Sequence, residues 1–271
     1  MALARRIAPA YLRNPYVAAV LVAGSVGRGI ADERSDLELD VFWSVPPSED
    51  ERRAPIDACG GAVRAFHAFE DDEWAETFEV AGVKVDTSMF LAATLDRYLA
   101  EVVDRASTDP GRHVLIAAVQ DGVPLHGHEL VARWRARAAS YPDRLACAMV
   151  AHHLDRLSRW PYAQLLAARD DAVMLNDLLG EASRTVLGLL LALNRRYLPH
   201  PGFKWLNHIA AGMTLAPPDL AGRLRAALRA EPQAAVDGMH ELLVETLTLL
   251  DAHLPGAGTG PGWKLVRANS R

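Results

Sequence analysis

The chain of 271 residues has little cysteine: two residues, Cys59 and Cys147, far apart in sequence. They cannot build a disulfide framework, their spacing is not that of a zinc site, and both are expected to be reduced and structural. The longest hydrophobic run, VLGLLLALN, is far shorter than the roughly 20 residues that a membrane-spanning helix needs. Because the N-terminal segment lacks an apolar stretch followed by a cleavage site, no signal peptide is expected, and the simplest expectation is a cytoplasmic protein.

An excess of positive charge is also absent, since the formal net charge is −5 at pH 7. Without a global positive field, a role as a non-specific nucleic-acid binder is disfavoured, although a local basic groove is compatible with this composition. Arg133, Arg135 and Arg137 alternate with apolar residues on an expected helix, which is more typical of a solvated face than of an RNA-binding surface. No internal repeat or low-complexity tract is visible, so one large or two small globular domains are expected.

What is present is a change of pattern near residue 125. Before it, short β-rich runs alternate with helical segments. YVAAVLVAG and DLELDVFWSV are expected strands, ETFEVAGVKVDTSMFLA is an expected hairpin turning at Ala81-Gly82, and HVLIAAVQDGVPLHG is an expected strand with a turn. These segments predict an α/β (α+β) domain over residues 1–128.

Beyond that point the pattern is almost entirely helical. Residues 162–199 have apolar positions at helical spacing and predict one long helix that Pro199 ends, with further helices before and after it. The Gly- and Pro-rich tail from residue 255 onward is expected to be extended. An all-α helical bundle over residues 129–271 follows from this pattern.

Between the first two expected strands lies a short segment suited to binding an anion. Gly24, Gly27 and Gly29 allow the backbone to approach a ligand closely, Ser25 supplies a hydroxyl and an N–H, and Arg28 supplies a fixed positive fork. Together these groups would hold phosphates most naturally. The segment is neither a Walker A loop nor a dinucleotide-binding fingerprint, because the residues that define those motifs are missing.

The second expected strand carries three acids at alternate positions, Asp36, Glu38 and Asp40, which therefore project from one side. Neighbouring carboxylates raise each other's pKa and cost stability. Magnesium would reverse that effect, because it prefers hard oxygen ligands together with water and phosphates. Carboxylates facing bound phosphates form a two-metal arrangement for displacement at phosphorus. The alternative, an ordinary turn before a solvated strand face, is weakened because both features occur together and in order.

The stretch AGSVGRGIADERSDLELDV resembles the signature of the nucleotidyltransferase superfamily built on a DNA polymerase β-like core. That signature is a hydrophobic residue, Gly-Ser, a gap, and then Asp, a hydrophobic residue, Asp or Glu, and another hydrophobic residue. The resemblance implies a nucleotidyltransferase core with a mixed β-sheet. It also implies that Asp36 and Glu38 bind Mg²⁺ and that Gly24, Ser25 and Arg28 hold the triphosphate. Asp40 lies at a position that the family leaves variable and is a weaker candidate.

The family also uses a third carboxylate from a later strand. In GVKVDTSMF, Val83 and Val85 are expected to point inward, whereas Lys84, Asp86 and Ser88 point to the other side. Asp86 is therefore the expected third carboxylate, as a metal ligand or as the base that activates the acceptor hydroxyl. The sequence leaves both roles open, and a surface acid on an edge strand is the alternative interpretation.

A helical bundle after such a core resembles the layout of aminoglycoside and lincosamide nucleotidyltransferases, in which the second domain holds the acceptor. The helical half also resembles, more loosely, the C-terminal part of an uncharacterised bacterial group of predicted nucleotidyltransferases. Within NRRYLPHPGFKW, Lys204 is a candidate for reaching the phosphates, and Trp205 or Tyr197 for stacking on the base. The alternative is a well-packed loop with solvated cations.

Other polar residues of the helical half have simpler interpretations. Asp170 and Asp171 come at the start of an expected helix segment, where acids favour the helix dipole, and a contact with the acceptor is the alternative. A metal-binding role for His152 and His153 is disfavoured, because no histidine or carboxylate follows at zinc-site spacing.

The function predicted from the sequence is Mg²⁺-dependent transfer of a nucleoside monophosphate from an NTP, with ATP as the first candidate, to a hydroxyl of a small-molecule acceptor. Pyrophosphate is released, and the resemblance suggests an aminoglycoside-like or lincosamide-like acceptor. Antibiotic modification is the role that such an acceptor implies, and the sequence leaves biosynthesis and regulation open beside it. Transfer to tRNA or protein is one alternative, and a non-catalytic nucleotide-binding regulator on the same fold is another. The sequence specifies neither the acceptor, the preferred NTP, the general base nor the oligomeric state, for which a homodimer stays open.

Overall fold

The computed structural model describes residues 1–269, which divide into two compact units. The first unit comprises Met1–Asp104 and Leu115–Ser140. The second comprises Arg105–Val114 and the chain from Tyr141 onward. Helix α6 (His128–Ala138) groups with the first unit, so this division falls at Ser140, whereas the change of sequence pattern places a boundary at 128/129.

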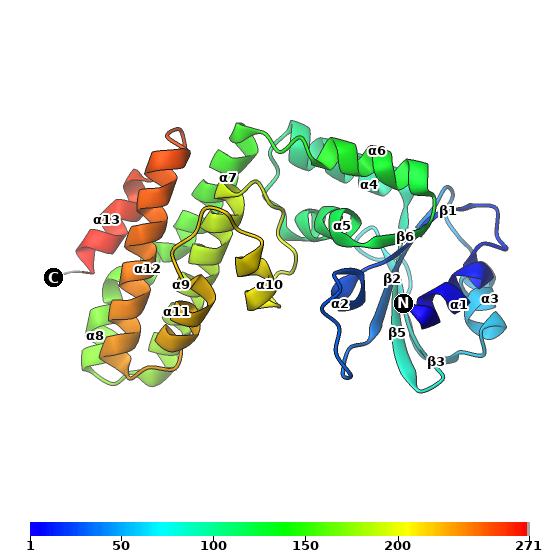
Figure 1. Ribbon diagram of the computed structural model, residues 1–271, viewed down its shortest axis with the longest axis horizontal. Helices are drawn as coiled ribbons and strands as arrows, with labels where there is room; N and C mark the ends of the chain where they lie inside the picture. Colours follow the sequence, from blue (N-terminus) through cyan, green and yellow to red (C-terminus); the bar gives the residue numbers. More distant parts are fainter. Residues whose placement is uncertain (270–271) are drawn as a thin grey trace. The chain divides into compact units, whose positions relative to one another are not determined.

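The first unit is built on a six-stranded sheet with the order β3–β4–β5–β2–β1–β6 (Figure 1). Strands β2 and β5 pair in parallel and all other neighbours pair antiparallel, so the sheet is mixed as expected. The strands are β1 Val17–Val22, β2 Leu37–Trp43, β3 Ala62–Phe66, β4 Trp74–Val80, β5 Val83–Leu91 and β6 Val123–His126.

The tight turn between β4 and β5 is confirmed. Ala81 and Gly82 both have positive φ angles, of 53° and 76°. Two-residue hairpins favour this left-handed backbone at both positions because its twist matches that of the flanking strands. The turn fixes the register, which places Thr77 of β4 opposite Asp86 of β5.

One face of the sheet is buried under helices α1 (Ala2–Tyr11) and α3 (Glu49–Ala58) (Figure 1). The core between them contains Ile7 and Ile56 from the helices and Leu39 and Val85 from the central strands. Side chains along a strand alternate between faces, so the odd-numbered residues of β2 and β5 enter this core. Their even-numbered neighbours therefore point to the opposite face.

One segment expected to be a strand is a helix in the structure. The segment HVLIAAVQD forms helix α5 (Pro110–Asp121), and the expected strand there is wrong. A short apolar run does not distinguish a strand from a buried helix, and Leu115, Ile116 and Val119 are buried at helical spacing. The other helical elements are α2 (Gly24–Gly27), α4 (Ala92–Leu99) and the π-helical turn η1 (Ala100–Asp104).

The second unit is helical, as expected. The predicted single helix over 162–199 is interrupted, however: α8 ends at Ala168, Asp170 has a φ of 52°, and α9 begins at Ala172. The tail predicted to be extended contains helix α13, which has Pro261 in its first turn, where proline is favoured. Its last two residues, 270 and 271, lie outside the described part. The elements are α7 Asp143–Leu154, η2 Asp155–Tyr162, α8 Ala163–Ala168, α9 Ala172–Leu193, α10 Leu206–Ala211, α11 Leu220–Ala227, α12 Pro232–His253 and α13 Gly260–Ala268.

Among residues 1–269, no helix combines the length and the apolar character that crossing a membrane requires.

Candidate functional site

The face of β2 and β5 opposite the core carries the predicted acids. The parallel register pairs Glu38 with Asp86 and Asp40 with Ser88, and Asp36 immediately precedes β2. Adjacent strands lie about 4.8 Å apart, so side chains paired in this way are neighbours. The structure thus brings Asp36, Glu38 and Asp86 together on one face, although they come from segments almost 50 residues apart. We call these three carboxylates the acidic patch.

The same face becomes apolar beyond Asp40 and Ser88. The rings of Phe42 on β2 and Phe90 on β5 have centroids 5.8 Å apart, and the ring of Trp134 from α6 lies 4.8 Å from that of Phe42. The polar and apolar stretches therefore divide this face along the strand direction. Asp40 and Ser88 lie between the acidic patch and these aromatic rings.

The start of α2, Gly24-Ser25, lies directly against this patch, and we call it the Gly-Ser turn. Gly24 has a φ of +59°, and a Cβ atom at this position would lie 2.3 Å from a carboxylate oxygen of Glu38. The backbone N–H of Ala23 donates to the carbonyl of Glu38 at 3.0 Å. Glycine is therefore required both by the backbone conformation and by the close approach. The predicted phosphate-binding turn and the predicted metal ligands are contiguous, and Ser25 within the turn is buried.

Arg28 braces this turn from within the protein. Its side chain is 3% exposed, Nε donates to Oδ2 of Asp121 at 3.0 Å, and Nη1 donates to the carbonyl of Gly24 at 3.3 Å. Asp121 is the last residue of α5, and sequence reasoning missed it because the segment was interpreted as a strand. No local motif marks Asp121, so only the tertiary structure reveals this pair.

Lys84 is a second residue that sequence reasoning did not select. Its Nζ lies 2.6 Å from Oδ2 of Asp86 and 3.3 Å from Oδ2 of Asp36. Thr77 donates to the other oxygen of Asp86 at 2.7 Å. Partial burial acts to raise the pKa of Asp86, but the hydrogen bonds from Lys84 and Thr77 hold this pKa below its ordinary value. Asp86 therefore stays ionised.

Asp40 behaves differently from the patch. It is buried, and its Oδ2 atom has no hydrogen-bond partner among the described residues. Burial raises the pKa of Asp40 to about 7, with further contributions from the negative charges of Glu38 and Glu73. In the protein without a bound cation, Asp40 is therefore partly protonated at neutral pH, unlike Asp86.

The oxygen atoms of the acidic patch are of the kind that magnesium binds, but they are not close enough together to hold an ion. In residues 1–269, no three side chains of His, Cys, Asp or Glu converge closely enough to hold a metal ion as they stand. Carboxylate oxygens are nevertheless the ligands that magnesium prefers, and two of them, on Asp36 and Asp86, already share one cation in the form of Lys84. The ammonium group would have to move for an ion to take its place.

The structure supports some of the roles predicted for residues of the second unit and argues against others. Lys204 is exposed and lies 5.6 Å from the ring of Trp205, but it belongs to the second unit, so its contact with phosphates stays a prediction. Tyr197 is 3% exposed and packs 5.0 Å from Tyr141, so its ring is not free to stack on a base. Asp171 is the N-cap residue of α9, yet its side chain makes no capping hydrogen bond.

His153 is part of the core of the second unit. It is 3% exposed, and a Cβ atom on Gly188 would lie 2.3 Å from its ring, so the imidazole packs directly on the α9 backbone. Burial lowers the pKa of His153 to about 3, with smaller contributions from His152, Arg156 and His113. A neutral imidazole in this position is a packing group.

Comparisons with known proteins give two findings. A family model described as a domain of unknown function (DUF4037) matches residues 111–206, which is less than half of the chain. Among solved structures, the chain is similar to a nucleotidyltransferase-like protein from Exiguobacterium sibiricum 255-15. The identity is 15%, the TM-score is 0.43, and the match covers 92% of this chain and 76% of that one. The search among curated proteins gives no match.

Proposed function

We propose that this protein is a magnesium-dependent nucleotidyltransferase. In the proposed reaction, a hydroxyl oxygen of a small-molecule acceptor attacks the α-phosphorus of an NTP, for which ATP is the first candidate. The bond from that phosphorus to the oxygen bridging the β-phosphate breaks, pyrophosphate leaves with the electron pair, and the hydroxyl proton passes to a base. The observation that carries the proposal is the acidic patch lying directly against the Gly24-Ser25 turn.

The acidic patch would hold the metal ion. Asp36, Glu38 and Asp86 supply only carboxylate oxygens, from two adjacent strands and one face. When bound, magnesium supplies positive charge that stabilises the charge developing on the phosphates and the attacking oxygen. The proposed role of Asp86 is that of the third ligand, and the alternative role of general base stays open.

The Gly-Ser turn would hold the triphosphate. Ser25 offers a hydroxyl and a backbone N–H in α2, shortly after β1. Gly24 leaves no side chain between this backbone and the carboxylate of Glu38. The pairing of Arg28 with Asp121 supports a positioning role, in which the guanidinium fixes the shape of the turn. Direct contact of Arg28 with phosphate would require its buried side chain to leave this pair with Asp121.

The acceptor class proposed from the resemblance is an aminoglycoside- or lincosamide-like compound, held by the helical second unit. Lys204 remains the proposed phosphate contact from that unit, with Trp205 as the proposed stacking partner for the base. Both are exposed or partly exposed side chains of the loop before α10.

The test is pyrophosphate release with each NTP, Mg²⁺ and a panel of hydroxyl acceptors. Asp36→Asn and Glu38→Gln are each expected to reduce turnover by about a hundredfold to a thousandfold, because each removes one charged ligand from the site. Glu33→Gln, which alters an exposed acid in the preceding loop, serves as the matched control and should retain turnover. Thermal unfolding should show that all three variants remain folded.

A second measurement separates binding from catalysis. The wild-type protein should gain thermal stability with Mg²⁺ and NTP together, and Asp36→Asn should lose that gain. Undiminished turnover in Asp36→Asn would refute the proposal. A nucleotide-dependent shift without pyrophosphate release for any acceptor would instead favour a binding protein.

A further inference from the structure

Lys84 places a positive charge between two carboxylates of the acidic patch. Its ammonium nitrogen is 2.6 Å from Oδ2 of Asp86 and 3.3 Å from Oδ2 of Asp36. The sheet explains this geometry: Lys84 and Asp86 are alternate residues on one face of β5, and Leu37, which follows Asp36, pairs with Val85. Strand register therefore directs the lysine to the gap between the two acids.

The residue type suits a cation that has to leave. Lysines are three of the 29 basic residues in the chain, so most of its positive charges are on arginine. A lysine ammonium is a compact point charge on a flexible stem, whereas a guanidinium forms a planar, bidentate pair. The Lys84 side chain is 55% exposed, so its ammonium can move into solvent without disturbing the core.

We propose that Lys84 is an internal counter-ion of the site, which occupies the position of the metal until a metal–nucleotide complex displaces it. The inference rests on the proposed function and adds a means of regulation at the same site. The Lys84 ammonium repels any further cation that approaches Asp36 and Asp86, because like charges at short range repel each other. Free metal must therefore displace the ammonium before it can bind, which weakens its binding.

A metal ion bound to a triphosphate overcomes this competition more easily, because the phosphates bring their own oxygen ligands and bind the Gly-Ser turn at the same time. The displaced lysine has another carboxylate nearby. Glu79 of β4 pairs with Lys84 in the hairpin register, and at present it accepts a hydrogen bond from Arg64 at 2.8 Å. Lys84 thus makes the site select the metal–nucleotide complex over the free ion.

The test uses Mn²⁺ alone as the probe, without nucleotide, and counts free Mn²⁺ by electron paramagnetic resonance. Lys84→Met keeps the length of the side chain and removes its charge, and it is expected to bind Mn²⁺ at least tenfold more tightly than wild type. Lys84→Arg keeps the charge and replaces the ammonium by a bidentate group, so it should bind Mn²⁺ no more tightly than wild type. Lys264→Met removes an exposed lysine of α13 and is the matched control, with unchanged affinity expected.

A second readout follows the thermal unfolding of the same proteins in EDTA and in Mg²⁺. Without its counter-ion, Lys84→Met should show a larger Mg²⁺-dependent rise in melting temperature than wild type. Equal Mn²⁺ affinities for wild type and Lys84→Met would overturn the inference. The proposed function would survive that result if wild type still gained stability from Mg²⁺ with ATP, and absence of binding under all these conditions would overturn both.

Discussion

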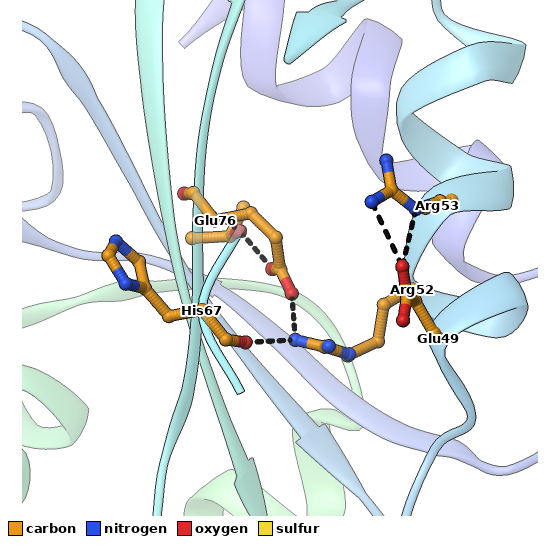
Figure 2. Close-up of polar contacts among 6 residues, drawn as sticks. Glu49, Arg52, Arg53, His67 and Glu76 are labelled. Atoms are coloured by element: carbon orange, nitrogen blue, oxygen red, sulfur yellow. Dashed lines mark hydrogen bonds and ion pairs between the residues drawn. The ribbon is translucent and has the colours of Figure 1, made fainter. Parts of the chain in front are cut away.

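The two faces of the sheet use acids in opposite ways. On the core face, Glu76 of β4 is fully buried and accepts hydrogen bonds from Arg52 and from Thr87, each at 2.7 Å (Figure 2). Arg52 also donates to the backbone carbonyl of His67 at 2.8 Å. On the other face, Asp36 and Asp86 share one lysine whose side chain is 55% exposed.

The difference shows which cation is replaceable. Removing one member of a buried pair leaves an uncompensated charge in the core, whereas an exposed pair can be exchanged for water or another ion at small cost. Arg52 is further confined by its approach to the ring of Phe66, at 4.2 Å from the centroid. The buried pair is therefore a structural element, and the exposed cluster is suited to binding.

Breaking the buried pair should have the largest effect. Arg52→Met leaves Glu76 without its cation, and the expected loss is about 3–5 kcal/mol of unfolding free energy. Chemical denaturation measures it. The double variant Arg52→Met with Glu76→Gln removes both charges and should recover part of the loss, and a loss below about 1 kcal/mol in the single variant would contradict the contrast between the faces.

The second largest effect is expected from His153, a buried histidine that has no acidic partner within residues 1–269 to stabilise its charged form. The pKa of His153 falls from 6.5 to about 3 because of burial, and His152, Arg156 and His113 add to this shift. The unfolded chain thus binds the proton more readily, so the stability contributed by neutral His153 is lost as pH falls below 6.5. Between pH 7 and pH 5 this loss should be about 2 kcal/mol, at 1.36 kcal/mol per pKa unit.

Denaturation at both pH values tests this expectation. His153→Leu should lose less stability on acidification than wild type, by about that 2 kcal/mol. His253→Leu, which alters an exposed histidine at the end of α12, should leave the wild-type pH dependence unchanged. An identical pH dependence in His153→Leu and wild type would show that folding does not shift the pKa of His153.

Two glycine-to-alanine variants should have a smaller effect on stability, and comparing them distinguishes backbone strain from the geometry of the site. Gly24 and Gly60 both have positive φ, but a Cβ on Gly24 meets the carboxylate of Glu38 and one on Gly60 meets nothing within 4 Å. Both alanine variants should lose about 1–2 kcal/mol from the left-handed backbone. Only Gly24→Ala should also lose the thermal shift with Mg²⁺ and NTP, because it displaces Glu38, and equal shifts in the two variants would count against the site.

The smallest stability effect is expected at the exposed cluster. In EDTA, Lys84→Met should unfold with a loss below about 1 kcal/mol, since exposed ion pairs contribute little. Urea denaturation beside Arg52→Met gives the direct comparison of the two faces. A loss as large as that of Arg52→Met would show that Lys84 is a structural group and not a replaceable one.

The sequence predicted the acidic patch because its signal is local. Alternation with period two places Asp36 and Glu38 on one face of a strand. The hairpin signal around Ala81-Gly82 marks the start of a second strand, in which the same alternation places Asp86 on the polar face. The bridging position of Lys84 was not predictable, because it depends on the register between strands that lie almost 50 residues apart. Asp121 was missed for a related reason, since α5 was interpreted as a strand and its pairing with Arg28 spans the unit.

The fold was predicted in class but not in detail. Helical periodicity identified the second unit, but it could not locate the break at Asp170, where the chain adopts a left-handed conformation that a residue other than glycine rarely takes. The Gly- and Pro-rich composition of the tail concealed α13, because proline disfavours the interior of a helix but not its first turn.

The parallel pairing of β2 with β5 has a consequence for how reliably the acids align. A slip of one residue along either strand would send the charged side chains into the interior and expose the aliphatic ones. Leu39 and Val85, buried beneath the opposite face, penalise that slip. The apolar face of the sheet therefore fixes the register that aligns the carboxylates on the other face. Substitutions in this apolar face can lower activity without changing any residue of the acidic patch.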